Sequence, residues 1–341
     1  MKTIYSTLPQ ENVTISIDYS SVWEIALGIA GYTYTQLRHT FEFDEIWNDT
    51  SMSPRLIKNL NEIQDTNLWY GILLMQSKLA ANTILEFSDA INTLTSDEFY
   101  EALLPYKDRI NESFRQHTAK NLSNLHKYAS LFKKHEYLVG YVLSLSQRNK
   151  TEIISLFIET LSDWYDWFHE KGDWKKWMQA LSFEEKQNVT IDYTKPYEEI
   201  ERITGGVKYL PEPSIWNIKL IPHVSYRPWL LELRTNETKL FFYPIKEESL
   251  LEPGVPSQEL IRGHKALGDE LRLKLLYQIM RGPHSLQELS TSFNVTKTTL
   301  HHQLSLLKAA KFITVDKGTY SANTVQIQSF TSQLHTYLGD K

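Results

Sequence analysis

The sequence contains no cysteine and no long apolar run. The first absence excludes structural disulfides, thiol redox sensing and thiolate metal sites. The second excludes a transmembrane helix, which needs about eighteen or more consecutive apolar residues. Residues 1–11 also contain no apolar signal core. We therefore expect a cytoplasmic protein without a membrane partner.

The common motifs of catalytic sites are missing as well. The zinc-protease pattern His-Glu-x-x-His fails twice, because the second histidine is replaced by Val139 after His135 and by Asp173 after His169. Neither a phosphate-binding glycine-rich loop nor a Gly-x-Ser-x-Gly elbow occurs. We expect no catalytic residues and no cofactor, with an enzyme active site inside residues 1–250 as the alternative.

Near the C-terminus, a leucine repeat predicts an amphipathic helix over 296–307. Leu300, Leu304 and Leu307 share one face of it. The opposite face carries hydrogen-bond donors and no acidic group, namely Lys297, Thr298, Thr299, His301 and His302. Thr296 can cap the helix, which leaves backbone N–H groups free for a phosphate. The DNA major groove accepts such a helix; the simpler interpretation is an ordinary surface helix.

The surrounding segments complete a larger pattern. Residues 285–288 form a capping box that opens a short helix, and 293–295 supply a tight turn. Before them, 264–281 is predicted to be one longer helix that ends at Gly282-Pro283. After the leucine helix, residues 312–321 predict a strand, a turn and a second strand. This order of elements is that of a winged helix-turn-helix.

Residues 264–323 resemble the DNA-binding domain of ArsR-type transcriptional regulators. The matching segments are 266–276, 286–289, the leucine helix and the hairpin. One departure is Lys311, which stands where that family usually has a glycine between the recognition helix and the wing. We expect a slightly different helix exit there.

The resemblance implies a sequence-specific transcriptional regulator that binds a double-stranded DNA operator with an inverted repeat. It also implies a homodimer that acts as a repressor and pairs through 264–281 and 325–338. The expected DNA-binding residues are Lys297, Thr298, Thr299, His301, His302, Lys308, Lys317 and Thr319. Because some winged helices bind proteins, a protein-interaction module is a further alternative.

Metal sensing is not expected. Many ArsR-type regulators sense soft metals through cysteines, which this chain does not have. Acidic residues and His169 crowd the segment 163–173, but such density on a helix is usually solvated. His335 lies where some relatives bind zinc at a dimer interface, yet it has no clear partner ligands in the sequence.

The charge is divided unevenly along the chain. The whole sequence carries a formal net charge of −5, but residues 257–341 hold ten Lys and Arg against six Asp and Glu, a net of +4. The remaining residues therefore carry −9. A basic module on an acidic body is typical of a regulator that places one end on DNA. Because +4 is modest, useful affinity should require a dimer.

The predicted fold class is mainly α (α+β), with a large helical N-terminal domain over 1–250. That domain is expected to contain a strand at about 12–18 and a small antiparallel sheet at about 189–245. The strands expected in that region are 189–192, 207–210, 217–221, 229–233 and 239–243, with a hairpin turn at 235–238. A linker at 251–258 then leads to the winged helix-turn-helix domain at 259–341.

Four of the nine tryptophans fall within fourteen residues, as Trp164, Trp167, Trp174 and Trp177. One interpretation is core packing or a domain contact. The other is the wall of a pocket for a small-molecule or peptide effector. The acidic balance of the body argues against an anionic effector. Alternatively, the whole N-terminal body only strengthens dimerisation.

Overall fold

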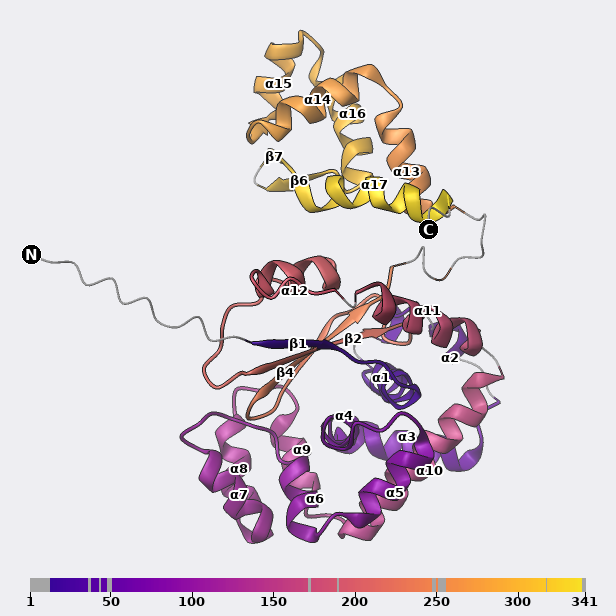
Figure 1. The fold of residues 1–341 in the computed structure, drawn as a ribbon, viewed down its shortest axis with the longest axis vertical. Helices are drawn as coiled ribbons and strands as arrows, with labels where there is room; N and C mark the ends of the chain where they lie inside the picture. Colours follow the sequence, from indigo (N-terminus) through magenta and orange to yellow (C-terminus); the bar gives the residue numbers. More distant parts are fainter. Residues whose placement is uncertain are drawn as a thin grey trace, which may run out of the picture. The chain divides into compact units, whose positions relative to one another are not determined.

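The computed structural model describes residues 13–35, 38–42, 44–47, 51–170, 173–188, 190–246, 250, 256–316 and 318–338. The chain divides into two compact units, unit 1 up to Ile245 and unit 2 from Lys246 (Figure 1). Most of the linker expected at 251–258 lies outside the described residues. Among those that are described, no helix is long and apolar enough to cross a membrane.

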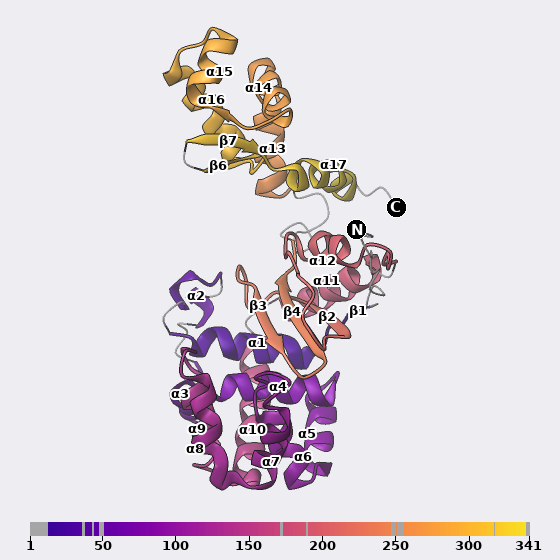
Figure 2. The same cartoon turned by 90° about the vertical axis from the view of Figure 1, so that its left-hand side faces the viewer.

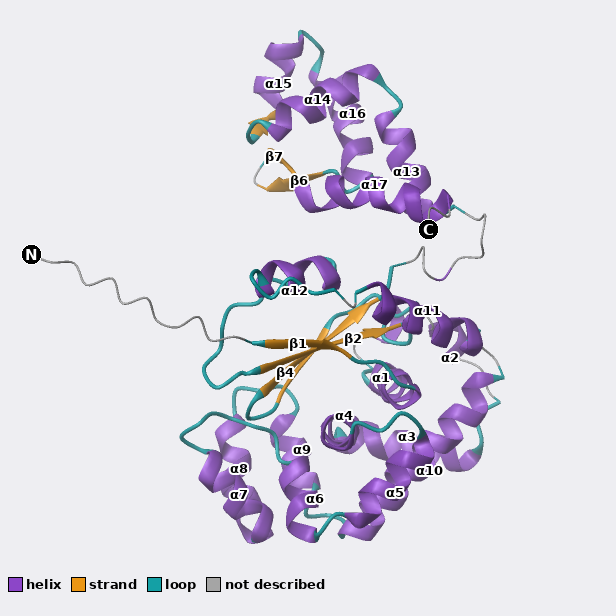
Figure 3. Ribbon diagram, viewed as in Figure 1, coloured by secondary structure: helices purple, strands orange, loops and turns teal. Residues whose placement is uncertain are grey.

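Unit 1 is mainly helical, as predicted (Figure 3). Its α-helices are α1 (Ser21–Thr33), α2 (Asp44–Trp47), α3 (Pro54–Thr66), α4 (Leu68–Leu79), α5 (Ile84–Thr93), α6 (Ser96–Leu103), α7 (Glu112–Lys120), α8 (Leu125–Ala129), α9 (Leu138–Ser144), α10 (Lys150–His169), α11 (Trp174–Gln187) and α12 (Pro196–Thr204). Short 3-10 helices are η1 (Arg38–Thr40), η2 (Leu122–Asn124) and η3 (Ser130–Phe132).

Helix α1 is the central helix of this unit. The Ser20 hydroxyl accepts a hydrogen bond from the Trp23 N–H at 3.1 Å and so caps the helix. Nearly every residue from Val22 to Ala30 is buried, as expected of a helix that is covered on all sides. It packs against α3, α4 and α10 and also contacts strand β2 (Asn217–His223) (Figure 2).

A buried carboxylate joins α1 to the end of that strand. Glu24 is 1% exposed and accepts hydrogen bonds from the Val224 N–H at 3.1 Å and from the Ser225 hydroxyl at 2.5 Å. Burial raises the pKa of Glu24 above its ordinary value, although these donors oppose the shift. A charge placed this deep is acceptable only because its lone pairs are occupied.

The sheet of unit 1 is mixed rather than antiparallel. Its strands β1 (Thr14–Ile17), β2, β3 (Leu231–Arg234) and β4 (Thr238–Pro244) lie in the order β1-β2-β4-β3. Strand β1 pairs parallel to β2, and β2 pairs parallel to β4; the antiparallel pair is β3 with β4. The expectation of an antiparallel sheet was therefore wrong for most of it. The chain passes from β2 to the edge strand β3 and then turns back into β4, so β4 runs parallel to β2. Strand β1, from the start of the described chain, adds a second parallel pair.

Individual strand predictions had mixed outcomes. The strand near 12–18 is confirmed by β1, and the turn at 235–238 is confirmed by the Thr235 N–H, which donates to the Thr238 carbonyl at 2.9 Å. Residues 207–210 and 190–192 are not strands, and Val189 lies outside the described residues. Tyr209 is nevertheless buried, with its ring 5.6 Å from that of Phe241. The neighbouring Leu210 is 80% exposed, so this run is buried at one position only.

Unit 2 has its own core. Its elements are α13 (Gln258–Leu267), α14 (Glu270–Met280), β5 (His284–Ser285), α15 (Leu286–Phe293), α16 (Lys297–Ala309), β6 (Ile313–Asp316), β7 (Thr319–Ala322) and α17 (Thr324–Leu338). The strands form an antiparallel sheet in the order β5-β7-β6. Leu275, Leu289 and Phe312 meet in the core with the leucine face of α16. The expected order of helices and hairpin is present.

The single helix expected over 264–281 is in fact two helices. The Gly268 N–H donates to the His264 carbonyl and closes α13, and the Asp269 carboxylate accepts from the Arg272 N–H at 3.0 Å and caps α14. Glycine after a helix and aspartate before one are the usual stop and start signals. The leucines at helical spacing on both sides of Gly268 and Asp269 made the segment resemble one continuous helix.

The exit from α16 has the backbone of a glycine turn although a lysine stands there, so the expectation of a different exit was wrong. Lys311 adopts the left-handed region with φ of 59°, where a glycine would be unstrained. Its ammonium lies 3.3 Å from the carboxylate of Glu259 on α13. Glu259 also accepts hydrogen bonds from Gln326 and Gln333 of α17. The helix exit is thus tied to both α13 and α17.

Helices α13 and α17 approach each other closely at Gly263. A Cβ placed there would lie 2.6 Å from Phe330 Cζ, well inside contact distance. The Phe330 ring is 7% exposed and packs on Phe312 at 5.1 Å. The absence of a side chain at Gly263 is therefore a packing requirement.

We predict that Gly263→Ala lowers the stability of unit 2 by about 1–3 kcal/mol, because Phe330 must move out of a close-packed site. All nine tryptophans lie in unit 1, so hydrogen exchange in α13 and α17 is the appropriate measurement. Gly282→Ala is the control, since its added Cβ would meet nothing within 4 Å. Equal protection in the two variants would contradict the packing argument.

Candidate nucleic-acid interface

Local hydrogen bonds fix both the start of α15 and the turn between α15 and α16. The predicted capping box is present: Ser285 Oγ accepts from the Glu288 N–H at 3.3 Å, and Glu288 Oε2 accepts from the Ser285 N–H at 2.8 Å. The latter bond is the main reason that the pKa of Glu288 lies below its ordinary value. Asn294 ends α15 with a φ of 52°, and the Ser290 hydroxyl donates to the Val295 carbonyl at 2.7 Å.

Helix α16 separates its residues by face, as the leucine spacing predicted. Leu300, Leu304 and Leu307 are each at most 1% exposed. The six side chains of α16 that are expected to meet DNA are all exposed: Lys297, Thr298, Thr299, His301, His302 and Lys308. The exposed face carries no acidic residue. Its donors therefore face solvent without an anionic neighbour on the same helix.

The first turn of α16 combines a side-chain cap with free backbone donors. Thr296 Oγ1 accepts from the Thr299 N–H at 3.2 Å and lies 2.9 Å from the Thr299 hydroxyl. The N–H groups of Lys297 and Thr298 precede this bond and have no acceptor within the helix. The side chains of Thr298, His301 and His302 are exposed and make no hydrogen bond with the residues that the structure describes. The N-terminal end of α16 is therefore suited to bind an anion.

The structure describes one of the two hairpin residues expected to contact DNA. Thr319 is half-buried in β7, where it pairs with Ser285 of β5 and with Asp316 of β6. Lys317, the expected contact at the wing tip, lies outside the described residues. The DNA-contacting roles of both residues stay predictions.

Arg272 positions α16, a role that was not predicted from the sequence. Its side chain, 12% exposed, donates to the carbonyls of Ala266 at 2.6 Å and Lys265 at 2.8 Å in the last turn of α13. Its third nitrogen, Nη1, donates to Gln303 Oε1 on α16 at 2.8 Å. One guanidinium therefore joins three helices, which a lysine ammonium is not shaped to do. An arginine just after a helix break is a weak signal that such a role can be present.

The residues considered for metal binding are not gathered into a metal site. Asp163 accepts two hydrogen bonds from the guanidinium of Arg55, at 2.7 and 2.5 Å. In the described part of the chain, no three His, Asp or Glu side chains are placed to hold a metal ion. The side chain of His335 is outside the described set.

The tryptophan cluster mostly forms core contacts. Trp164 is 1% exposed and stacks on Phe168 at 5.9 Å, and Trp177 packs on the same ring at 5.1 Å. Trp167 is 8% exposed and donates to Ser51 at 3.1 Å. Trp174 lines a shallow, open hollow. Packing explains these contacts, and the effector role stays a prediction.

The helix-turn-helix with its polar outward helix and following hairpin defines a class of DNA-binding domain. Residues 269–315 match the family model described as "Bacterial regulatory protein, arsR family". The C-terminal region therefore contains an ArsR-type helix-turn-helix domain, as predicted, and this points to DNA binding and transcription regulation. The match extends from the cap of α14 into β6. No curated protein and no solved structure matches the chain.

We predict that Arg272→Ala destabilises unit 2 by about 2–3 kcal/mol, because a charged donor group is lost from three acceptors. Hydrogen exchange in α13 and α16 measures the effect. Lys274→Ala on the same helix is the control: its side chain is 60% exposed and, among the described residues, pairs with Glu270 alone, so a change of about 0.5 kcal/mol or less is expected. Similar losses in both variants would argue against the positioning role.

Proposed function

We propose that the protein is a sequence-specific regulator of transcription that binds double-stranded DNA through α16. The observation that carries the proposal is the exposed, acid-free face of this helix, which is held on the core by its leucines. In this arrangement Thr298 and His302 reach base edges in the major groove. The free N–H groups at the start of α16, with Lys297, bind a phosphate and set the register.

We further propose that the regulator acts as a homodimer. A net charge of +4 on residues 257–341 allows few phosphate contacts per copy, so two copies are needed for strong binding. Helices α14 and α17 carry exposed apolar side chains suited to pairing: Leu273, Tyr277, Met280, Val325 and Leu338. A dimer bound across a promoter excludes the transcription machinery, which makes the protein a repressor.

Unit 1 is proposed to be the sensing part of the regulator. It has a large buried core, and a folded body serves regulation when an effector binds it and changes the affinity of the DNA-binding unit. We assign it no catalytic role. A body that only strengthens dimerisation would leave operator affinity unchanged by any small molecule.

The first test of this function is the shape of the operator. We predict a footprint over an inverted repeat whose half-site centres lie about 10 bp, or one DNA turn, apart. Sedimentation of the complex should give two protein copies per operator. A single unrepeated half-site with one copy bound would refute the dimeric arrangement.

The second test is base readout. Thr298→Ala and His302→Ala should each cost about 1–3 kcal/mol of operator binding per half-site and relax sequence preference. Thr93→Ala, an exposed threonine at the end of α5, is the matched control and should bind like the parent. Operator titrations with single base-pair changes measure both effects. Parental specificity in both α16 variants would show that another surface reads the DNA.

A further inference from the structure

Unit 1 contains a cavity of about 360 Å³ that no function above has used. It lies between helices α4 and α6, the start of α7 and the sheet hairpin of β3 and β4. This volume is within the range of about 300–1,000 Å³ typical of small-molecule sites. Because all its walls belong to unit 1, it is complete within that unit.

The wall of this cavity is basic, although the body that contains it is acidic. Four basic side chains line it against two acidic ones, and the basic ones are Lys78, Arg115, Lys219 and Arg234. The sheet side contributes Lys219 and Arg234 together with neutral polar residues. Counted over the lining side chains alone, this is a net charge of +2 inside residues 1–256 of net charge −9, and it favours an anion at this place.

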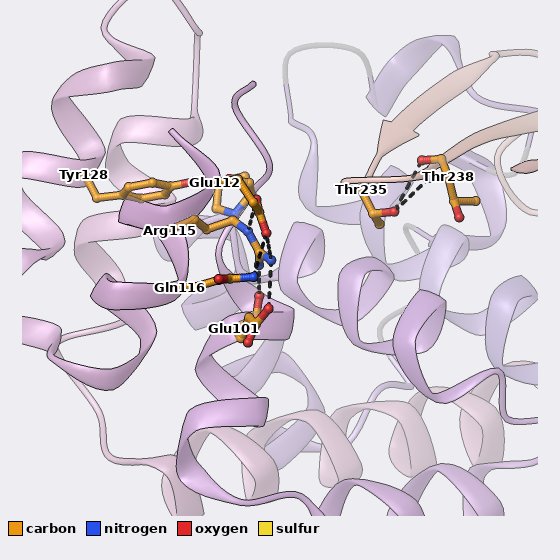
Figure 4. Close-up of polar contacts among 8 residues, drawn as sticks. Glu101, Glu112, Arg115, Gln116, Tyr128, Thr235 and Thr238 are labelled. Atoms are coloured by element: carbon orange, nitrogen blue, oxygen red, sulfur yellow. Dashed lines mark hydrogen bonds and ion pairs between the residues drawn. The ribbon is translucent and has the colours of Figure 1, made fainter. Parts of the chain in front are cut away.

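Two of the four cations are already committed to the protein. Arg115 is held between Glu112 at 2.7 Å and Glu101 at 3.0 Å (Figure 4). Arg234 pairs with Glu212 and lies 5.0 Å from the ring centroid of Tyr106. These guanidinium groups form a rigid wall, so they are not the first contacts of a ligand.

The two lysines are less committed. Lys78 lies in the last turn of α4 and is exposed, and it forms no ion pair with the described residues. Within the described part of the chain, Lys219 on β2 has one ion-pair partner at a long distance, Asp18 at 3.9 Å. Their ammonium groups are point charges on flexible stems that can close on a small anion. Two such charges beside the carboxylate of Glu98 suit one negative charge better than two.

The rest of the lining indicates the remainder of the ligand. Leu74 and Leu104 with the ring of Tyr106 offer an apolar wall. Ser77 and Asn236 add hydrogen-bonding groups at its edge. An apolar wall with a few polar groups is the usual composition of a site for a small organic molecule.

We propose that this cavity is the effector site of the regulator and that it binds a small organic monocarboxylate. Lys78 and Lys219 bind the carboxylate, and the apolar part lies against Leu74, Leu104 and Tyr106. The effector role rests on the proposed function, whereas binding itself does not. The local wall thereby reverses the expectation, drawn from the net charge of the body, that an anionic effector is disfavoured.

The test uses the full protein and three matched sets of probes: benzoate, phenylacetate and hexanoate, each with its amine and alcohol counterpart. Binding is measured by calorimetry and by tryptophan emission, which reports on unit 1 alone. At least one carboxylate should bind about tenfold or more tightly than its amine and alcohol, the factor expected for a charge-assisted contact. Equal binding of the alcohols, or binding by no carboxylate, overturns the proposal.

Variants locate the site. Lys78→Ala and Lys219→Gln should each weaken carboxylate binding about tenfold, with an unchanged far-ultraviolet circular dichroism spectrum. Lys58→Ala, an exposed lysine on α3 outside the cavity, is the control and should bind like the parent. Unchanged affinity in both cavity variants overturns the site.

Operator titrations separate the two levels of the proposal. The bound carboxylate should change operator affinity in the parent and not in Lys219→Gln. If the parent binds its operator but no carboxylate binds the protein, the cavity assignment fails and the proposed function stands. If a carboxylate binds at the lysines without changing operator affinity, the effector role is overturned while the binding site is retained.

Discussion

The arrangement of the DNA-binding unit depends on donors for the carbonyl groups at the end of α13. The last carbonyls of any helix have no partner within it, and here the guanidinium of Arg272 binds two of them. The same group reaches Gln303 on α16. The direction of the recognition helix is therefore set by a charged group that is largely withdrawn from solvent, in addition to the leucines beneath it.

Most of the DNA-binding unit was predictable because its signals are local. The capping box at Ser285, the cap at Thr296 and the leucine spacing each act over one or two helical turns. The contacts of Arg272 with Ala266 and Gln303 were not predictable, since they depend on how helices meet. The break at Gly268 could have been found, but the regular leucines on both sides concealed it.

The sheet of unit 1 shows the opposite case. Strand β1 and strand β2 are some two hundred residues apart in the sequence, yet Ile15 pairs with Ile218. No local pattern specifies such a partner, and apolar alternation is the same in parallel and antiparallel strands. Sequence reasoning therefore found three of the strands in 189–245 and the hairpin turn at 235–238, and it missed the direction in which β2 and β4 pair.

The net charge of a domain likewise does not predict the charge of one cavity inside it. The balance of −9 for the body includes many exposed carboxylates, whereas the cavity wall has four basic side chains. The tryptophans were conspicuous in the sequence for the converse reason. Large rings draw attention, but Trp164 and Trp177 are mainly packed against Phe168.

At Lys311, where the chain leaves α16, the stability of the unit and the rigidity of the helix exit depend on different features. Its left-handed backbone costs a non-glycine residue about 1–2 kcal/mol, and the ion pair with Glu259 returns up to about 1 kcal/mol. Replacement by the family's usual glycine would therefore leave the melting temperature nearly unchanged or slightly raised. It would also cut the link from the recognition helix to α13. A measurement of unfolding stability would therefore not detect the replacement of Lys311 by glycine, although the exit from α16 would become more flexible.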